Sequence, residues 1–523
     1  AAAGPQGGGA AGRRLGLGVL GAAAVAGPTY YWYVKEFGWD DEEEEEKQLE
    51  FEFPRVEKKR HEAQASGLVG LCNRLKQLLL DCIRAIELGT IFLLPVASLP
   101  LWYIFPSDWW LKLLMSCMQL GGPTFTKLGQ WASTRPDLFG NNVRDCLRVL
   151  HDQVRLEPWS STKATLEMAF NGTNISDHFS EFSEQPIGAG CIAQVHQARI
   201  RNTGEVVAVK VQRERVRRLI ERDLALLSRA VWCVEALLPR AYVDNFGLRK
   251  TVDLFNHFMR DQMDFSLEAY NLQQFNKNFR KSQLAVHFPK AKYVSPCGRV
   301  LIESLEAGRP LTRVLHDDGI SASVKHKIGS LGVRSFLKMV LVDNFVHSDL
   351  HPGNILVNFA PDDPKKLNSI TFIDAGLVTE LTKQDQRNFV DLFAAVATGN
   401  GRLAGELMIE RQPKEQLVRC KDPEGFIQGI DDVVSTVKID SFRLDRVDIG
   451  RILERVLSLV HTYHVPIDSS FSNLVLSIIV LEGLGRQLDP ELDIFRESLP
   501  ILYKIDKTYT IAALQVARKT AFG

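Results

Sequence analysis

The sequence predicts an α+β fold of two lobes, a small β-rich lobe followed by a larger lobe that is mostly helical. Short β-rich runs separated by turn residues fill residues 182–212, whereas most of the chain after residue 310 carries apolar residues at helical spacing. A polar motif, FVHSDLHPGNILV, begins at residue 345 and is followed by SITFIDAGL. The order of these three features places a polar site where the two lobes meet.

The polar motif has the spacing of a phosphoryl-transfer site. A loop of the form H-x-D-x-x-x-x-N carries an Asp that orients the attacking group and an Asn that holds Mg²⁺, and an Asp-x-Gly after the next strand holds a further Mg²⁺. His347, Asp349, Asn354, Asp374 and Gly376 occupy these places. Oxygen ligands of this kind suit Mg²⁺ and triphosphate. We therefore predict that Asp349 is catalytic, that Asn354 and Asp374 bind metal, and that ATP and Mg²⁺ are the cofactors.

The motif also allows a different interpretation, because His-x-Asp-x-His at residues 347–351 matches ligands of a two-metal hydrolase. That site needs further His or carboxylate ligands on other strands, and most of the chain's 12 histidines are scattered over polar, helix-like segments. It also leaves Asn354 and Asp374 unexplained. We favour phosphoryl transfer.

Composition restricts the class of protein. The 523 residues have room for two to four domains, and 45% hydrophobic residues are enough for substantial cores. The 63 basic and 63 acidic residues cancel, so no overall basic field argues for a nucleic-acid partner. The eight cysteines lie far apart without a C-x-x-C motif, which is typical of free thiols in a reducing compartment.

Residues 1–50 are predicted to form a targeting leader and an acidic linker. Small residues, an arginine pair and no acidic residue before Glu36 are typical of the end of a mitochondrial presequence. The arginine pair and apolar core also fit a secretory signal, but the cysteine pattern favours mitochondria. Residues 15–34 are also just long enough to span a bilayer, and the acidic run at residues 40–46 is typical of a solvated linker.

Residues 51–114 are predicted to be helical and close to a membrane. Apolar residues recur at helical spacing over residues 66–94 and become nearly continuous in IFLLPVASLPLWYIF, residues 91–105. Pro95 and Pro100 argue against a simple membrane span. Two interpretations stay open: a helix that lies on or dips into a membrane beside three nearby tryptophans, or a buried core helix.

Residues 115–175 are predicted to form a helical extension before the small lobe. Pro123 can open a helix, and Lys127 and Gln130 lie three positions apart on one face of it. Residues 143–170 predict another pair of helices.

Residues 176–310 are predicted to form the small lobe. A strand, a G-A-G-C-I-A-Q-V turn, a second strand, an Asn-Thr-Gly hairpin turn and a third strand follow one another. The two glycines permit phosphates to approach the backbone, and Lys210 ends V-V-A-V-K as the phosphate-binding lysine of kinases does. The predicted nucleotide-binding loop comprises Ile187, Gly188, Ala189, Gly190, Cys191, Ile192, Ala193 and Val195.

Two glutamates complete the predicted nucleotide site. In a kinase the phosphate-binding lysine is fixed by a glutamate from a facing helix. Glu268 is the candidate, although an exposed position on its helix is the alternative. Residues 298–306 predict a strand that ends near Glu303, where a hinge would receive adenine.

Residues 311–523 are predicted to form the large lobe and C-terminal helices. A long helix over residues 321–342 leads to the catalytic loop. Only G-L-V-T-E-L stands between the Asp374 motif and a helix-like run at residues 382–398, so the longer segment with which protein kinases place a peptide is missing. Residues 474–485 are apolar but too short to span a membrane, which favours a core helix.

Taken together, these motifs make the chain similar to the UbiB/aarF family of atypical protein-kinase-like proteins over roughly residues 115–500. The shared motifs are K-x-G-Q at residues 127–130, the nucleotide loop, the strand lysine, HSDLHPGN, Asp-Ala-Gly and EGLGRQLDP at residues 482–490. In this family the K-x-G-Q helices cover the site where a peptide would enter. The resemblance therefore implies ATPase or small-molecule kinase activity, with Lys127 and Gln130 at the active site.

The resemblance also implies partners. The family is implicated in coenzyme Q biology at mitochondrial inner membranes, so a hydrophobic small molecule or lipid such as a quinone precursor, the membrane, and coenzyme Q biosynthetic proteins are expected. A different class of function stays open, in which the chain is a catalytically silent scaffold that ATP switches. Two departures from the family matter: Gly188 and Gly190 stand in an otherwise alanine-rich loop, and Gln262 replaces the glutamate of an E-x-D motif whose Asp264 is kept.

Overall fold

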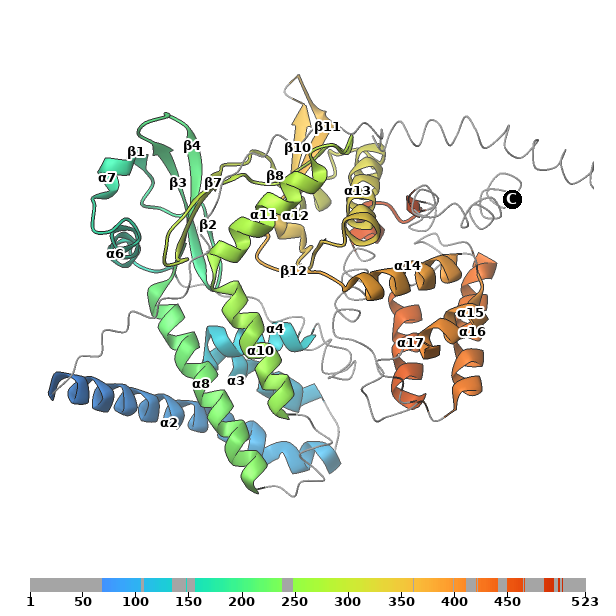
Figure 1. Ribbon diagram of the computed structural model, residues 1–523, viewed down its shortest axis with the longest axis horizontal. Helices are drawn as coiled ribbons and strands as arrows, with labels where there is room; N and C mark the ends of the chain where they lie inside the picture. Colours follow the sequence, from blue (N-terminus) through green and yellow to red (C-terminus); the bar gives the residue numbers. More distant parts are fainter. Residues whose placement is uncertain are drawn as a thin grey trace, which may run out of the picture.

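The computed structural model describes the larger part of the chain as two lobes with further helices beside them (Figure 1). The described residues are 68–104, 108–133, 147, 156–237, 248–360, 362–397, 399–410, 420, 422–440, 449–463, 465, 484–492, 497–498 and 501. The predicted leader at residues 1–50 and most of the apolar run at residues 474–485 lie outside them. The α+β class predicted from the sequence is confirmed.

The small lobe is built on an antiparallel sheet in the order β1-β3-β4-β7-β6, with β2 paired to β3. Its strands are β1 (Phe179–Phe182), β2 (Gly188–Ala189), β3 (Ala193–Ile200), β4 (Val206–Gln212), β6 (Ala291–Val294) and β7 (Val300–Ser304). Val207, Val209 and Val211 alternate along β4 and pack with Phe179 in a core beside α6 (Trp159–Ala169) and α7 (Ile175–His178). Lys210 consequently faces the other side of the sheet.

Three described helices follow Lys210 in the chain before β6. They are α8 (Glu214–Leu237), α10 (Leu248–Gln262) and α11 (Phe265–Phe279). The break falls at Asp264, which is the N-cap of α11 and accepts a hydrogen bond from the Ser266 amide at 3.0 Å. The Phe265 amide donates to the carbonyl of Gly298 instead of continuing α10. The apolar pattern continues through both helices, so periodicity alone does not reveal this break.

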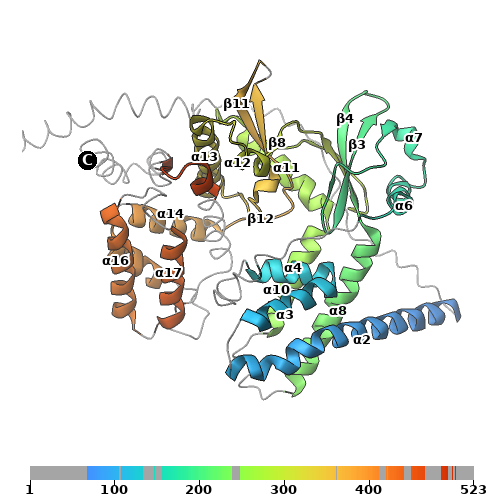
Figure 2. The same ribbon diagram turned by 180° about the vertical axis from the view of Figure 1, so that it is seen from behind.

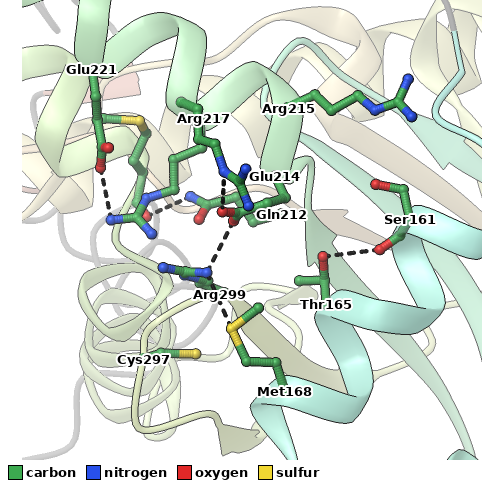
Figure 3. A network of polar contacts seen from close by, with 12 residues as sticks. Ser161, Thr165, Met168, Gln212, Glu214, Arg215, Arg217, Glu221, Cys297 and Arg299 are labelled. Atoms are coloured by element: carbon green, nitrogen blue, oxygen red, sulfur yellow. Dashed lines mark hydrogen bonds and ion pairs between the residues drawn. The ribbon is translucent and has the colours of Figure 1, made fainter. Parts of the chain in front are cut away.

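A polar network braces the back of the small lobe (Figure 3). Arg299, just before β7, donates to Glu214 at the start of α8 at 3.0 Å and to the Met168 sulfur on α6 at 3.4 Å. In the same view the Arg215 side chain points away from these contacts. Arg299 therefore joins α6 and α8 to the turn that precedes β7.

The N-terminal helices lie below the small lobe (Figures 1 and 2), where the first and third pack on α8, the third also meets α10, and the second packs on the other two. They are α2 (Leu68–Ile104), α3 (Asp108–Gly121) and α4 (Pro123–Ser133). The helix that Pro123 is predicted to open is therefore present. The helix predicted for this region is present, and α2 continues as one helix through Pro95 and Pro100. By length and composition, residues 75–101 could cross a membrane, with a mean hydropathy of 1.7 and 17% of the apolar window buried.

The large lobe begins at α12 (Leu311–Leu315) and α13 (Ala322–Leu337), which continues as a π-helical turn to Asp343. Its sheet has the order β5-β11-β10-β8, and a separate pair joins β9 to β12. These strands are β5 (Val286–His287), β8 (Arg309–Pro310), β9 (Val346–His347), β10 (Ile355–Ala360), β11 (Asp363–Phe372) and β12 (Val378–Thr379). Although β5 and β8 precede residue 311, both pair in the large-lobe sheet. The chain therefore crosses between the lobes more than once.

Four described helices follow β12 and lie beside the large lobe (Figure 1). They are α14 (Lys383–Ala397), α15 (Gly401–Glu410), α16 (Pro423–Asp440) and α17 (Ile449–Tyr463). Only residues 375–382 separate Asp374 from α14, as the sequence predicts.

Candidate active site

Lys210 is the centre of a charged cluster that three separate elements build. Its ammonium group donates to Glu268 Oε1 at 2.8 Å and Oε2 at 2.9 Å, and to Asp374 Oδ1 at 3.2 Å. Lys210 comes from β4, Glu268 from the buried face of α11, and Asp374 from the turn after β11. Both oxygens of Glu268 are engaged by Lys210, so the alternative of an exposed helix residue is wrong.

The charges of this cluster tune one another. Burial alone would lower the pKa of Lys210, but the carboxylates of Asp374, Glu268 and Glu303 raise that pKa above its ordinary value. The ammonium group of Lys210 in turn lowers the pKa of Asp374. Lys210 therefore stays charged, and Asp374 is an ionised carboxylate at neutral pH, as a metal ligand must be.

Asp374 is held in an unusual backbone conformation. Its φ is +60°, in the left-handed region that Asp and Asn tolerate better than other residues with side chains. The next residue, Ala375, is buried, and its carbonyl accepts a hydrogen bond from the Asn271 side chain at 2.8 Å. Asn271 lies on α11, as Glu268 does, so one helix fixes both the lysine partner and the Asp374 turn.

The loop between β9 and β10 brings His347, Asp349 and Asn354 together. His347 is fully buried, its Nδ1 accepts the Asp349 amide at 3.2 Å, and its Nε2 faces the Ile373 carbonyl at 3.4 Å. Burial lowers the pKa of His347, so the ring is neutral and positions the loop. The Asn354 amide nitrogen donates to Asp349 Oδ2 at 3.0 Å, which leaves the Asn354 oxygen for a cation.

The predicted nucleotide loop is a tight turn between β2 and β3. The Gly190 amide donates to the Ala193 carbonyl at 2.9 Å. A methyl group placed on Gly188 would meet nothing within 4 Å, and on Gly190 it would meet only the Ala193 carbonyl oxygen at 3.9 Å. No side chain of the described residues crowds the backbone at these two glycines, as approach of a phosphate requires.

Arg213 contacts the nucleotide loop, although the sequence does not predict that it belongs to the site. Its guanidinium donates to the carbonyls of Gly190 at 3.3 Å and Cys191 at 3.0 Å. In the sequence Arg213 begins a basic run of the kind found on exposed helix faces. The sequence around it therefore does not indicate a contact with the loop. Arg213 holds the turn to the end of β4.

Helix α4 brings the K-x-G-Q motif to the same site. The charge of Lys127 contributes to the low pKa of Asp374, after the larger effect of Lys210. Gln130 lies one turn further along α4 and is half-buried. Of the altered E-x-D motif, Asp264 caps α11, and the Gln262 side-chain oxygen is buried and has no hydrogen-bond partner among the described residues.

Glu303 lies in an environment that disfavours its ionised form. It lies on β7 and is 9% exposed, and no side chain or backbone group in the described part of the chain makes a hydrogen bond to its buried Oε2 atom. Burial, together with the nearby charge of Glu268, raises the pKa of Glu303 to about 8.

The oxygen donors of this cluster fit Mg²⁺. Asp374 supplies an ionised carboxylate and Asn354 an amide oxygen, both hard ligands. Within the described ranges no three His, Cys, Asp or Glu side chains gather as a metal site, and His351 instead accepts the Gly353 amide at 3.1 Å. A site with few protein ligands suits Mg²⁺, which keeps water and phosphate oxygens. This arrangement gives no support to the two-metal hydrolase interpretation.

The small lobe has five antiparallel strands in a row and carries the lysine–glutamate pair, and the helical lobe carries the loop with Asp349 and Asn354. Together these features define a protein-kinase-like fold. Comparison with known families agrees. Residues 149–408 match the ABC1 atypical kinase-like domain, and residues 438–493 match the UbiB helical domain. The predicted kinase-like fold class is confirmed.

Several curated proteins are similar over most of their length. The chain is 32% identical to the probable serine/threonine-protein kinase abkC of Dictyostelium discoideum, over 81% of this chain and 69% of that protein. It is 33% identical to a mitochondrial ABC1 family protein of Saccharomyces cerevisiae, over 80% and 74%. It is 30% identical to the probable protein kinase UbiB of Pasteurella multocida, over 75% and 74%. The chain belongs to the ABC1/UbiB family of atypical kinase-like proteins.

Proposed function

We propose that this chain binds MgATP between its lobes and either hydrolyses it slowly or transfers its terminal phosphoryl group to a small, lipid-like acceptor. The observation that carries the proposal is the Lys210 cluster, in which Glu268 holds the lysine and Asp374 lies at 3.2 Å from the same ammonium group. Kinases use this trio to bind the phosphates of ATP and one metal ion.

Each residue has a role in this proposal. Lys210 binds the α- and β-phosphates, and the backbone of residues 187–195 covers them. Asp349 orients the acceptor hydroxyl or water, because Asn354 fixes one of its carboxylate oxygens at 3.0 Å. Asn354 and Asp374 hold Mg²⁺, which neutralises phosphate charge when it is bound.

A small acceptor fits this site better than a peptide. Only residues 375–382 follow Asp374 before α14, too few for the segment with which protein kinases position a peptide. The charge of Lys127 on α4 reaches Asp374, which supports a covering role for this helix. Water or a small molecule remains as the acceptor.

The proposed setting is a mitochondrial membrane, in support of coenzyme Q or lipid metabolism and beside coenzyme Q biosynthetic proteins. Two relatives are named as mitochondrial, and the arginine-bearing leader is consistent with that compartment. One relative is named UbiB. We propose the inner membrane as the site of attachment.

Helix α2 supports membrane attachment. Its buried residues include Arg84, Pro95 and Ser98, whereas large apolar residues cover its remaining surface. The exposed ones are Leu75, Leu78, Leu79, Ile83, Ile86, Leu93, Leu94, Val96, Leu99 and Leu101. A helix that packs on the protein along one side and exposes apolar residues along the others favours binding in the membrane surface over a free span.

Replacement of Asp349 by asparagine tests the chemistry. We expect MgATP binding to persist and turnover to fall about 100-fold or more, because the variant keeps the shape of the loop but loses the carboxylate that orients the acceptor. Turnover is measured with purified protein and cardiolipin-containing liposomes. Asp318→Asn, an exposed position in the same lobe, is the matched control. Undiminished turnover in Asp349→Asn contradicts the role, and full rescue of function in cells by this variant favours the ATP-switched scaffold.

Liposome flotation tests the membrane role of α2. A protein that lacks residues 1–50 is expected to float with cardiolipin-containing liposomes, and changing Leu78, Leu79, Ile86 and Leu93 to serine is expected to abolish flotation, because apolar burial drives such binding. The matched control changes Leu267, Val342 and Leu403 to serine; these residues are also exposed and apolar but lie on other elements, so flotation should persist. If the truncated protein stays wholly soluble, the membrane role of α2 is wrong.

A further inference from the structure

Arg213 fixes the tip of the predicted nucleotide loop from outside the loop. Its Nη1 atom donates to the Gly190 carbonyl at 3.3 Å and to the Cys191 carbonyl at 3.0 Å. The Arg213 amide also donates to the Ile192 carbonyl at 2.8 Å. Arg213 follows the end of β4 at Gln212 and directly precedes α8, so one residue of this strand–helix junction holds three consecutive carbonyls of the loop.

The Ile192 side chain gives the loop tip a second attachment. It packs against an apolar cluster that includes Trp131 of α4, Val216 of α8 and Phe255 of α10. The tip is therefore held by a cationic side chain and by apolar contacts at the same time. Both attachments belong to the fold itself, and a loop that is fixed in this way loses less conformational entropy when a ligand binds.

The contacts of Arg213 decide which way the peptide groups of the tip point. In a trans peptide the carbonyl of one residue and the amide of the next point in opposite directions from the same plane, and the described residues contain no cis peptide bond. Because the Gly190 and Cys191 carbonyls point to Arg213, the Cys191 and Ile192 amides point away from it. The Ile192 amide donates to no group of the described residues, so it is available to an acceptor.

Gly190 makes this arrangement easy to lose. A glycine adopts either sign of φ at little cost, so the peptide group after it can turn over and exchange its carbonyl for its amide. A phosphate attracts backbone amides and is repelled by carbonyl oxygens. We propose that Arg213 is a positioning residue for the nucleotide phosphates, which holds the tip so that the amides of Cys191 and Ile192 meet them. This inference rests on the proposed function and adds to it a residue outside the loop.

Replacement of Arg213 by methionine tests this role, because methionine keeps an unbranched side chain but cannot donate a hydrogen bond. The full chain and the variant are titrated with MgATP and with adenosine, which lacks the phosphates. We expect Arg213→Met to bind MgATP about tenfold or more weakly, as loss of hydrogen bonds to a charged group predicts, and to bind adenosine within about twofold of the unaltered protein. Arg213→Lys keeps a cationic donor and should bind MgATP within about threefold of the unaltered protein.

Arg215→Met is the matched control, because it removes the same charge from an exposed side chain that points away from the polar contacts in Figure 3; its MgATP affinity should be unchanged. Ile192→Ala loosens the apolar attachment and should also weaken MgATP more than adenosine, which gives a test that does not depend on the folding of Arg213→Met. Equal weakening of both ligands, or unchanged MgATP affinity, in these two loop variants overturns the inference and leaves the proposed function intact. Failure of the unaltered protein to bind MgATP refutes the proposed function and this inference with it.

Discussion

Replacing Asp374 by asparagine is expected to abolish the stabilisation that MgATP gives the unaltered protein. A ligand that binds only the folded state adds RT ln(1 + [L]/Kd), or about 2.7 kcal/mol at a ligand concentration 100-fold above Kd. Among the described residues, Asp374 and Glu268 are the carboxyl groups within 4 Å of the Lys210 ammonium group, and both oxygens of Glu268 are occupied by that lysine. Lys210 lowers the pKa of Asp374, whereas burial raises the pKa of Glu268 to about 7. Asparagine keeps an amide oxygen at this position but not the negative charge with which Asp374 binds Mg²⁺, so the variant is expected to lose this stabilisation.

Asparagine is the suitable replacement because it also tolerates the φ of +60° at this position. A thermal shift assay compares the unaltered protein, Asp374→Asn and the exposed control Asp318→Asn, each with ATP in the presence of Mg²⁺ or of EDTA. The control should keep the full shift, and EDTA should remove it. A MgATP shift in Asp374→Asn that equals the control contradicts the assignment of Asp374 as a metal ligand.

The residues of the site that the sequence reveals are those whose spacing is set locally. Asp349 and Asn354 belong to one short loop, and Asp374 follows the hairpin of β10 and β11, in which Phe372 pairs with Ile355 and so returns the chain to the loop. Lys210 and Glu268 are 58 positions apart, yet the pair is predictable because a buried lysine in this position needs a facing carboxylate. Local spacing and one electrostatic requirement together account for most of the cluster.

The sequence does not reveal features that depend on distant partners. The sequence predicts that Arg213 is an exposed charge on a helix surface, whereas in the folded chain it contacts the Gly190 and Cys191 carbonyls. Helix α2 continues through Pro95 because α3 lies alongside, where the Trp110 side chain donates to the Pro95 carbonyl at 2.9 Å. Proline disfavours a helix interior through its own backbone, and tertiary contacts here outweigh that preference. The partners of these contacts lie 15 to 23 positions apart, farther than the three or four positions at which side chains meet along one helix.

A second large effect is expected where α2 meets the rest of the protein, at Asp223 on α8. Asp223 is fully buried and accepts hydrogen bonds from Arg84 Nε at 2.8 Å, from Arg84 Nη2 at 3.0 Å and from the Thr124 hydroxyl at 2.7 Å. Arg84 comes from α2 and Thr124 from the first turn of α4. One carboxylate therefore ties the apolar helix α2 and the Lys127 helix α4 to α8.

Asp223→Ala is expected to lower the free energy of unfolding by about 3 kcal/mol, because it removes the buried partner of the Arg84 guanidinium and leaves only the half-exposed Glu87 at 2.8 Å. Asp81→Ala is the matched control: Asp81 joins the same helices α2 and α8 through Arg222 at 3.0 Å and Arg229 at 3.2 Å, but it is partly exposed, so its loss should cost about 1 kcal/mol or less. Urea unfolding measures both changes, and limited proteolysis should cut α2 free only in Asp223→Ala. Equal destabilisation by the two substitutions would show that the buried ion pair does not hold α2 to the protein.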